Sequence, residues 1–429
     1  MKILVIGSGG REHAILWSLR STASRPLNLY CAPGNAGIAQ LAHCIPIAAT
    51  AVDELADFAA SEEIDLTFVG PEAPLALGVV DEFKRRGLTI VGPSKVAAQL
   101  ESSKAFAKDF MKRHSIATAH YRTASSPSEA LDILNNGEFG DANAPVVVKA
   151  DGLAAGKGVI VSPDRATAIA AVGELVSGDL IDVHAAQRIV IEEKLDGSEV
   201  SLLAFCDGVN YALMPAARDH KRIGVGDTGP NTGGMGAITD DAILSSTQLA
   251  QITREVLEPT LAGAQREGFP FCGILFIGLM LTPAGPKVLE YNVRFGDPET
   301  QAILVRLKTS LEQIFSAMAE ARLGEINIEW SPRSSACVVL ASNGYPGKAR
   351  TGDLISGLDV ASSNVEIFHS GTVRSSTGDW LTAGGRVLGV TSTGETLSDA
   401  LKNCYQHVDH IRWQGMQYRS DIGKFAPNN

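Results

Sequence analysis

Three polar side chains alternate along one short stretch of the sequence, KVLEYNVRFGDPE, which spans residues 287–299. Because side chains two residues apart in a strand point to the same face, Glu290, Asn292 and Arg294 should share one face. A carboxylate and an amide oxygen are hard ligands that suit Mg²⁺, which also takes nucleotide phosphates. A guanidinium beside them could hold a carboxylate or a transferring phosphoryl group. The stretch therefore predicts a metal and phosphate site, with a half-exposed polar strand as the plainer alternative.

A second stretch, VVVKADGLAAGKGVIV at residues 146–161, places lysines and glycines between two β-branched runs. A P-loop is excluded, because the G-x-x-x-x-G-K-[ST] spacing is absent and VIV continues as a strand rather than a helix. The stretch predicts a β-hairpin whose glycines let a ligand approach the backbone and whose loop lysine could meet phosphate. Lys149 lies in the first strand, where a buried ammonium would need an anionic partner. Residues 152–158 are expected to form a mobile cover over bound phosphates, the alternative being a surface hairpin without a ligand.

A third stretch, IVIEEKLDGSE at residues 189–199, ends an apolar strand in Glu192, Glu193 and Lys194. The backbone leaving such a strand can read an adenine through its N–H and C=O groups, and Glu199 could accept hydrogen bonds from ribose hydroxyls. Together with the following VSLLAF, the stretch is predicted to form a β-hairpin. Acidic residues that flank a hairpin are usually just solvated, which is the alternative interpretation.

The N-terminal GSGGRE begins at Gly7 and follows a continuous apolar run. A dinucleotide-binding turn is disfavoured, because Glu12 stands where G-x-G-x-x-G needs its third glycine and no ribose-binding acid ends the next strand. A Gly-rich helix start still offers backbone N–H groups to an anion, and Arg11 adds a charge that can bind bidentately. An ordinary strand-to-helix turn is the alternative. A nicotinamide-dependent oxidoreductase that uses this turn is one rival prediction, which the missing glycine and acid disfavour. A nucleotide sensor without catalysis is a second rival, against which Glu290, Asn292, Lys149 and the Gly-rich loop argue.

Composition limits the class of protein. The 429 residues are 45% hydrophobic and 20% charged, which is typical of a globular protein of several domains. The formal net charge of −11 offers no general basic field to nucleic acid or to an anionic membrane. The chain opens on a strand rather than a signal-peptide core and has no apolar run of the ~18 residues that span a membrane, so a cytoplasmic protein is expected. The six cysteines show neither a zinc-binding spacing nor a disulfide framework, and no obligate protein partner is evident.

The elements that must position these residues divide the chain into three regions. Residues 1–103 alternate strands and helices and predict a doubly wound α/β domain, with a helix in ALGVVDEFKRRG that ends at Gly87. Residues 104–326 begin with a basic amphipathic helix and continue as an α+β region with an antiparallel or mixed sheet. Residues 327–429 include the predicted linker EWSPRSS, then short strands and a helix at TLSDALKNCYQHV. The fold class is therefore α/β and α+β, in a multidomain chain.

The order of these motifs resembles the ATP-grasp superfamily of carboxylate-amine ligases. More closely, it is similar to the phosphoribosylamine-glycine ligase family in the stretches GSGGREHA, APGNAG, VGPEAPL, SKAFAKDFM, KADGLAAGKGV, DHKR, DTGPNTGGMGA and EYNVRFGDPETQ. GYPG, TGD and GGRVLGV extend the likeness into the third region. The resemblance implies a pre-ATP-grasp domain at residues 1–103, an ATP-grasp domain at 104–326 with a lid at about 120–190, and a small mixed β/α domain at 327–429.

The resemblance also implies a reaction. ATP, glycine and 5-phosphoribosylamine would give glycinamide ribonucleotide, ADP and phosphate in purine biosynthesis, through a glycyl phosphate. Mg²⁺ or Mn²⁺ would be the cofactor, with Glu290 and Asn292 as its ligands. Another ATP-grasp carboxylate-amine ligase is the alternative function.

The site residues that the resemblance implies fall into three groups. ATP would be bound by Lys104, Lys149, Gly152, Gly156, Lys157, Gly158, Glu192, Glu193, Lys194, Leu195 and Glu199. Phosphoribosylamine would be bound by Gly9, Gly10, Arg11, Glu12, Asn35, Pro71 and Glu72. Glycine and the transferring phosphoryl group would be surrounded by His220 and by the catalytic residues Asp219, Lys221, Arg294 and Asp297.

One departure from the superfamily pattern concerns the metal. Many ATP-grasp enzymes carry a further metal-binding carboxylate on the preceding strand, where this chain has Ile277 and Gly278. A second metal held fully by protein groups is therefore not expected, although substrate phosphates could complete its shell.

Overall fold

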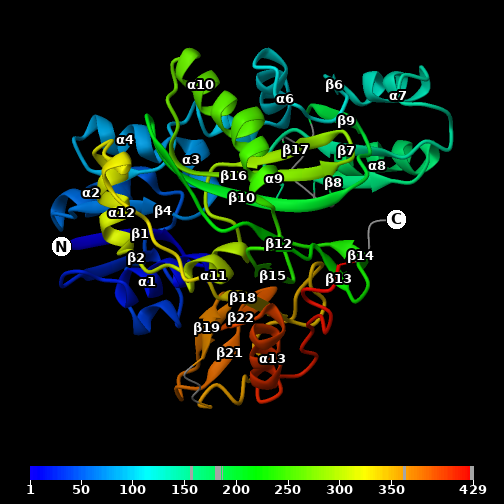
Figure 1. Ribbon diagram of the computed structural model, residues 1–429. Coiled ribbons are helices and arrows are strands. Elements are labelled where there is room, and N and C mark those ends of the chain that lie inside the picture. The colour runs from blue at the N-terminus through cyan, green and yellow to red at the C-terminus, as the bar shows by residue number, and fades with distance from the viewer. Residues whose placement is uncertain (155–157, 179–184, 186, 361–363, 426–429) are drawn as a thin grey trace.

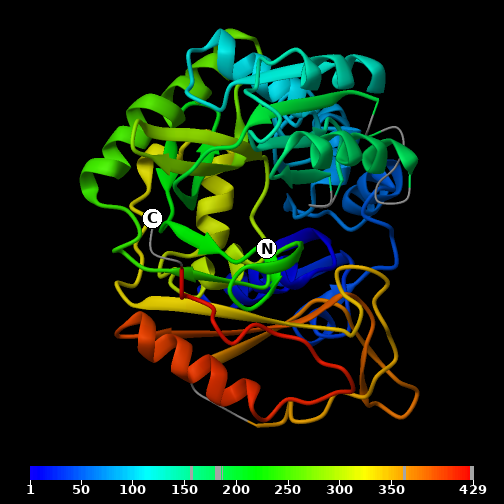
Figure 2. The same ribbon diagram turned by 90° about the vertical axis from the view of Figure 1, so that its right-hand side faces the viewer.

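A computed structural model describes residues 1–154, 158–178, 185, 187–360 and 364–425 of the chain. Figure 1 shows the N-terminal domain at the left in blue, a long central sheet in green, and the C-terminal residues in orange and red below it. A smaller sheet with its own helices lies at the upper right, and Figure 2 shows the same parts from the side. The described strands thus form three large sheets and two small ribbons.

The N-terminal domain is built on a parallel sheet with strand order β3-β2-β1-β4-β5. Its strands are β1 (Lys2–Gly7), β2 (Asn28–Pro33), β3 (His43–Cys44), β4 (Leu66–Val69) and β5 (Ile90–Val91). Its helices are α1 (Gly10–Ser21), η1 (Ile38–Gln40), α2 (Val52–Ser61), α3 (Glu72–Leu77), α4 (Val79–Arg85) and α5 (Gln99–Ser102). Alternate side chains of β1 enter two cores, Leu4 with residues of α2 and α4, and Ile3 with residues of α1. Helices therefore cover both faces, and the predicted doubly wound domain is confirmed.

The next part of the chain forms a four-stranded antiparallel sheet with strand order β6-β9-β7-β8. Its elements are α6 (Lys104–Arg113), β6 (Tyr121–Ala124), α7 (Pro127–Asn135), β7 (Val146–Ala150), β8 (Val159–Ser162), α8 (Arg165–Ser177) and β9 (Ile189–Glu193). β7 pairs with β8 from Val146 opposite Ser162 to Lys149 opposite Val159, so the hairpin predicted at residues 146–161 is confirmed. Val146 and Val148 pack under α7 and α8, which leaves Lys149 on the opposite face.

The central sheet continues from the second region into the third. Its strand order is β17-β16-β10-β12-β15-β18-β22-β19, with β11 paired to β10, and neighbouring strands are antiparallel. The strands are β10 (Ser198–Asp207), β11 (Tyr211–Leu213), β12 (Ala217–Asp219), β15 (Gly236–Thr239), β16 (Cys272–Thr282), β17 (Gly285–Asn292), β18 (Ser334–Ala341), β19 (Val365–His369) and β22 (Arg386–Gly394). β15 pairs with β18, Ala237 opposite Cys337, so the C-terminal strands extend the sheet of the preceding region.

The hairpin predicted around residues 189–205 is wrong. β9 pairs with β6 and β7, whereas β10 pairs with β16, β11 and β12 in the central sheet. The connection between them crosses from one sheet to the other at Gly197, where a Cβ would lie only 2.3 Å from the backbone oxygen of Leu281. The pattern of a strand indicates its burial, but its partners are set by contacts with distant segments, so two strands adjacent in sequence need not pair.

The remaining elements complete the connections. They are β13 (Arg222–Gly224), β14 (Thr228–Asn231), α9 (Ser246–Ile252), η3 (Thr253–Leu257), α10 (Glu258–Arg266), α11 (Glu299–Leu304), α12 (Leu311–Ala319), η4 (Leu323–Glu325), β20 (Thr372–Arg374), β21 (Trp380–Thr382) and α13 (Leu397–Val408). The predicted linker EWSPRSS is anchored rather than loose, because the buried Arg306 donates through Nε to the carbonyl oxygen of Ser331 at 3.1 Å. Arg306 also lies 2.7 Å from Asp241, which ties this segment to the end of β15.

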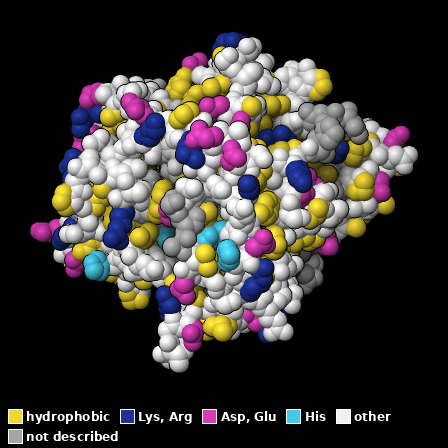
Figure 3. Space-filling view, turned by 60° about the horizontal axis from the view of Figure 1, so that its bottom comes forward, with side chains coloured by type: hydrophobic (Ala, Val, Ile, Leu, Met, Phe, Trp, Pro, Cys, Tyr) yellow, Lys and Arg dark blue, Asp and Glu magenta, His cyan; other side chains and the backbone are white. Residues whose placement is uncertain are grey.

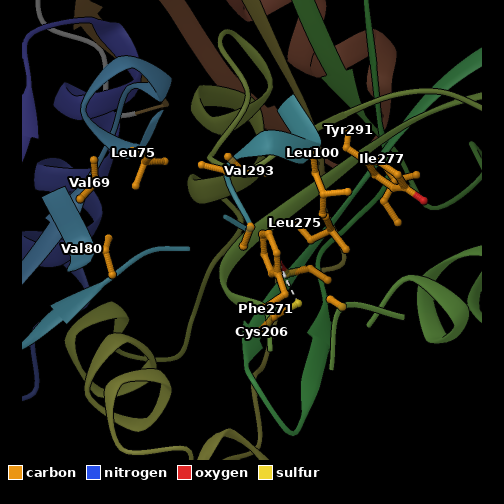
Figure 4. Close-up of a cluster of buried hydrophobic side chains, with 14 of the residues drawn as sticks. Val69, Leu75, Val80, Leu100, Cys206, Phe271, Leu275, Ile277, Tyr291 and Val293 are labelled. Carbon is orange, nitrogen blue, oxygen red and sulfur yellow. Dashed lines mark hydrogen bonds between the residues drawn. The ribbon is translucent and has the colours of Figure 1, made fainter. Parts of the chain in front are cut away.

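One apolar core joins the N-terminal domain to the central sheet (Figure 4). It includes Val69 and Val80 from the N-terminal domain and Leu275 and Ile277 from β16, none of them more than 2% exposed. Burying each such side chain contributes about 1.5–3 kcal/mol. The shared core therefore sets how the two parts face each other.

The surface carries mixed side chains. On the face shown in Figure 3, charged and apolar side chains are interspersed. Among the described residues, no helix is both long enough and apolar enough to cross a membrane. The cysteines, all of which lie in the described part of the chain, are free thiols.

Replacing Gly197 by alanine should destabilise the fold, because the new Cβ would meet the Leu281 carbonyl, a backbone group that cannot turn aside. We expect the free energy of unfolding to fall by about 1–3 kcal/mol, measured by urea denaturation. Gly173→Ala in α8 is the matched control: a Cβ added there would have no described atom outside its own helix within 4 Å. Alanine also favours a helix, so this variant should be neutral or slightly more stable. Equal losses in both variants would contradict a tight crossing at Gly197.

Candidate active site

A cleft of about 1330 Å³ lies where the parts of the chain meet. Its walls include Arg11 and Glu72 from the N-terminal domain, Lys149 and Glu192 from the four-stranded sheet, and Glu290 from the central sheet. Arg11 follows β1 and Glu72 follows β4, so the carboxyl ends of these parallel strands face the cleft. Ligands of doubly wound sheets bind at this edge.

The four-stranded sheet presents a buried group of charges to the cleft. Glu192 Oε1 lies 2.8 Å from Lys149 Nζ, and Glu192 Oε2 lies 3.0 Å from Lys108 Nζ. Lys108 also donates to Thr118 Oγ1 at 2.6 Å, and Lys149 to the carbonyl oxygen of Leu289 at 3.2 Å. Burial lowers the pKa of Lys108 to about 8, against the opposite pull of Glu192. The anionic partner that the sequence required for Lys149 is therefore Glu192, a carboxylate shared by two ammonium groups.

β17 presents Glu290, Asn292 and the following Arg294 to the cleft, as their spacing predicted. Burial pushes the pKa of the Glu290 carboxyl upward, but the surrounding cations outweigh it and hold this pKa below its usual value. These cations are Lys221, Lys149, Lys104 and Arg294. Glu290 is therefore ionised near neutral pH and stands in a field of positive charge that favours a further anion.

Arg294 joins β17 to the N-terminal domain. Its Nη2 donates to Asn292 Oδ1 at 3.0 Å and lies 2.9 Å from Glu101 Oε1, while its Nε lies 3.3 Å from Glu72 Oε2. Glu101 also accepts a hydrogen bond from the backbone N–H of Val293 at 2.8 Å. Glu101 was not predicted from the sequence, because it lies in no recognisable motif. It contacts Arg294 only in the folded chain. Carboxylates from two distant segments thus fix the orientation of the guanidinium.

Arg386 of β22 brings the C-terminal region to the cleft. Its Nη2 lies 2.9 Å from Asp297 Oδ2, and its Nη1 donates to the carbonyl oxygens of Asp297, at 2.7 Å, and of Gly233. Gln301 Nε2 donates to Asp297 Oδ1 at 2.8 Å. Sequence reasoning gave Arg386 no role, although it lies within the GGRVLGV stretch. Asp297 is therefore held on both carboxylate oxygens.

A further set of charges lies at the end of β12. Lys221 Nζ is 3.1 Å from Glu199 Oε2, and Glu199 is the main cause of the raised pKa of Lys221. Burial raises the pKa of Asp219 to about 7, with Lys221 opposing the rise and Glu299 adding to it. Glu299, which sequence reasoning also missed, is 4% exposed, and burial raises its pKa too. Asp219 is thus able to accept a proton near neutral pH.

Most residues assigned from the sequence line the cleft. They are Arg11, Pro71, Glu72, Lys104, Lys149, Gly158, Glu192, Glu193, Lys194, Leu195, Glu199, Asp219, His220, Lys221, Glu290, Asn292, Arg294 and Asp297. Others are not among the described residues that line it, namely Gly9, Gly10, Glu12, Asn35 and Gly152. Gly156 and Lys157 lie outside the described residues, as does Ala155 of the expected cover over the phosphates.

The residues at the start of α1 make contacts within the protein. Glu12 accepts hydrogen bonds from the backbone N–H of Gly9 and from Arg11 Nε, both at 2.6 Å. A Cβ on Gly10 would lie 2.5 Å from Ser370 Oγ, so this glycine lets the C-terminal region approach the helix. Of the two glycines that suggested an anion site, Gly9 donates its N–H to Glu12, and Gly10 allows close packing.

Asn35 and Gly152 likewise make contacts within the protein. Asn35 Nδ2 donates to the carbonyl oxygens of Ser8 and His369, at 2.7 and 2.9 Å. The backbone N–H of Gly152 donates to the carbonyl oxygen of Ala185 at 3.0 Å. These bonds connect loops that are far apart in the sequence.

The donor set on β17 fits a divalent cation. Glu290 supplies an ionised carboxylate and Asn292 an amide oxygen, both hard ligands. Gly278 lies opposite Glu290 in the β16–β17 ladder, at the place where the sequence showed no second carboxylate. Within the described ranges, no three or more His, Cys, Asp or Glu side chains are grouped closely enough to hold a metal ion themselves. A cation here would therefore need further oxygen ligands from phosphate or water.

The chain is similar to known proteins along most of its length. Three models of phosphoribosylglycinamide synthetase domains match it: the N domain at residues 1–101, the ATP-grasp (A) domain at 102–300 and the C domain at 335–425. Phosphoribosylamine-glycine ligase from Pseudomonas aeruginosa is 47% identical, over 99% of this chain and 97% of its own. The enzyme of that name from Clostridium acetobutylicum is 44% identical, over 99% of this chain and 100% of its own.

Solved structures agree with this comparison. The crystal structure of phosphoribosylamine-glycine ligase from Thermotoga maritima matches with a TM-score of 0.84 and 32% identity, covering 98% of this chain and 100% of its own. A biotin carboxylase domain from Hydrogenobacter thermophilus, in complex with MgADP and bicarbonate, matches with a TM-score of 0.72, covering 97% of this chain and 91% of its own. Its 15% identity shows a shared fold alone.

Replacing Glu192 by glutamine should destabilise the protein, because Lys108 and Lys149 would lose their shared counter-ion while staying buried. We expect the free energy of unfolding to fall by about 3–5 kcal/mol, measured by chemical denaturation without nucleotide. Glu193→Gln on the same strand is the control, since the Glu193 side chain is 40% exposed and its carboxylate pairs with Lys287 at 3.0 Å. That variant should lose about 1 kcal/mol or less. Equal losses would show that the buried cluster has no special weight.

Proposed function

The chain belongs to the phosphoribosylglycinamide synthetase family, and we propose that it uses ATP to join glycine to 5-phosphoribosylamine. The products are glycinamide ribonucleotide, ADP and phosphate, in purine biosynthesis. The chain is an ATP-grasp ligase, and the resemblance inferred from its motifs is confirmed. The observation that carries the proposal for this site is the convergence of Lys149, Lys104, Lys221 and Arg294 on the ionised Glu290 within one cleft.

We assign ATP to the part of the cleft between the two antiparallel sheets. Lys104 and Lys149 would face the phosphates, since both line the cleft and both act on Glu290. The backbone at residues 193–195, where the chain leaves β9, would meet the adenine, and Glu199 the ribose. The predicted role of residues 152–158 as a cover is part of this proposal.

We assign the divalent cation to Glu290 and Asn292, with nucleotide phosphate oxygens as its other ligands. When bound, Mg²⁺ or Mn²⁺ would neutralise charge on the transferring phosphoryl group. Glu290 and Asn292 would hold it from one strand face, and Arg294 keeps the Asn292 amide in place through the hydrogen bond from Nη2 to Oδ1 at 3.0 Å.

The two acceptors would lie on the opposite side of the phosphates. Phosphoribosylamine fits beside Arg11, Pro71 and Glu72 at the carboxyl edge of the parallel sheet, and glycine beside Asp219 and its neighbours. The proposed role of Gly9, Gly10, Glu12 and Asn35, which are not among the described residues that line the cleft, is to support this site.

The chemistry then has two steps. A glycine carboxylate oxygen attacks the γ-phosphorus, the bond to the ADP oxygen breaks, and glycyl phosphate forms. The amine nitrogen of phosphoribosylamine attacks the carbonyl carbon, the carbon–oxygen bond to phosphate breaks, and a proton leaves the nitrogen. Asp219, whose pKa is raised by burial, is the proposed acceptor of that proton. Lys221, Arg294 and Asp297 would position the reacting groups, which supplies most of the catalysis in such transfers.

Two broader predictions also stay proposals. The domain boundaries after residues 103 and 326 are those predicted from the sequence. The central sheet continues across the second boundary, because β15 pairs with β18. The cytoplasm is the proposed location, and no protein partner is proposed.

A coupled assay of ADP release tests the proposed function directly. ADP should form only when ATP, glycine, 5-phosphoribosylamine and Mg²⁺ or Mn²⁺ are all present, and mass spectrometry should identify glycinamide ribonucleotide. ATP binding without ADP release that depends on both acceptors would instead favour the nucleotide sensor.

Replacing Glu290 by glutamine should lower kcat by at least about 100-fold, because the carboxylate charge that anchors the cation is lost. The loss should not follow from unfolding, which thermal denaturation checks. Tyr291→Phe is the matched control on the same strand: the Tyr291 hydroxyl bonds to Thr260 Oγ1 at 2.7 Å, and Tyr291 packs in the apolar core. This control should lose stability while keeping kcat per folded molecule. Activity near the unmodified level in Glu290→Gln would rule out the metal assignment.

A further inference from the structure

The last described residues, 419–425, rise from the C-terminal domain to the β13–β14 ribbon (Figure 1). Arg419 is fully buried, with Nη1 at 2.5 Å from Asp227 Oδ1 and Nη2 at 2.7 Å from Asp421 Oδ2. Asp421 also accepts a hydrogen bond from the backbone N–H of Gly226 at 2.8 Å. A buried guanidinium held by two carboxylates thus anchors this segment, which we call the C-terminal tail, to the ribbon that follows β12.

The end of the tail reaches the wall of the cleft. The Phe425 ring is stacked on the His220 imidazole, with centroids 4.4 Å apart and planes inclined by 11°. The Arg218 guanidinium carbon lies 3.6 Å from the centroid of the same ring. Arg218 and His220 are two residues apart on one extended segment, roughly 7 Å, so one ring can contact both. All three side chains line the cleft.

A hydrogen bond makes the contact with His220 specific. The backbone N–H of Gly423 donates to His220 Nε2 at 2.9 Å, so this nitrogen carries no proton. Burial and, to a smaller extent, the nearby Arg419 together lower the pKa of His220 to about 4, so the ring is neutral at pH 7. Its proton is then on Nδ1, which lies 3.7 Å from Asp227 Oδ1. The histidine serves as a fixed acceptor for the tail rather than as a titrating catalyst.

His220 also fixes the backbone between two charged residues of the cleft. Its backbone N–H donates to the carbonyl oxygen of Gly236 at 2.9 Å, and its carbonyl accepts from the N–H of Met235 at 2.8 Å. Asp219 and Lys221 flank it on either side and line the cleft. The segment that carries both charged side chains is therefore held at His220 twice, through its backbone by Gly236 and Met235 and through its imidazole by the tail.

We propose that the C-terminal tail is a positioning element of the active site, in which the Phe425 ring holds His220 and with it the segment that carries Asp219. The inference rests on the proposed function, because Asp219 is there assigned to the glycine side of the cleft. Neither Phe425 nor the rest of the tail was assigned a role from the sequence. A covering role alone would need only an apolar group at residue 425, whereas stacking on imidazole and guanidinium needs an aromatic ring.

The test uses three variants at Phe425 and one control variant, all in the full chain. Phe425→Ala and Phe425→Leu should each lower kcat/KM for glycine by about tenfold or more, because misplaced reacting groups are costly, while KM for 5-phosphoribosylamine stays within about twofold. Phe425→Tyr should keep kcat/KM for glycine and KM for 5-phosphoribosylamine at the values of the unmodified chain. Lys424→Ala is the matched control, since the backbone bond of its N–H to the Asp421 carbonyl oxygen is kept and the side chain is exposed.

A second measurement does not depend on activity. Histidine-selective NMR should show the pKa of His220 moving from about 4 upward in Phe425→Ala, as the imidazole becomes exposed. Thermal denaturation of each variant separates this local effect from unfolding.

Two results would overturn the proposal. The first is unchanged constants for glycine in Phe425→Ala or Phe425→Leu. The second is an equal loss for all substrates that follows a lowered denaturation midpoint. The unmodified chain is assayed first. If it does not ligate glycine to 5-phosphoribosylamine, the proposed function is wrong. If it does, a loss of activity in the variants alone bears on the role of the tail.

Discussion

A buried carboxylate shared by two ammonium groups is the constraint on which the cleft depends. Glu192 neutralises only part of the charge of Lys108 and Lys149, and both lysines are almost fully shielded from water. Removing an ion from water costs several kcal/mol unless partners compensate. Two ammonium groups thus share one carboxylate, and Lys149 acts together with Lys104, Lys221 and Arg294 to lower the pKa of the nearby Glu290. A polyphosphate would complete this balance, so a chain with a net charge of −11 can offer an anion site through local arrangement.

The cleft is also where the separate parts of the fold are joined. Arg294 links β17 to Glu72 and Glu101 of the N-terminal domain, and Arg386 links β22 to Asp297. These ion pairs keep the guanidinium groups oriented toward the reacting region. The central sheet joins the same parts mechanically, because it runs unbroken from β17 to the C-terminal strands. Packing of the N-terminal domain against β16 then sets the distance between the two sides of the cleft.

Local patterns were enough for several parts of this description. The alternation in residues 287–299 placed Glu290, Asn292 and Arg294 on the cleft, because strand geometry has a period of two. The hairpin of β7 and β8 followed from β-branched runs around a glycine-rich loop. Patterns failed where pairing was nonlocal: β9 and β10 are neighbours in sequence but belong to different sheets. Glu101, Lys108 and Arg386 were missed for the same reason, since each acquires its partner from a distant segment.

The sequence by itself determined the family, the order of domains and the chemical types available at the site, because these depend on residue identity and short-range spacing. Tertiary structure decided which of those residues meet. It showed that Glu12 and Asn35 bond to neighbouring protein groups, and that Glu192 is the partner of Lys149. It also brought Phe425 onto His220, 205 positions earlier in the chain. Contacts of this kind arise from packing and burial of charge across distant segments, which no local spacing in a sequence records.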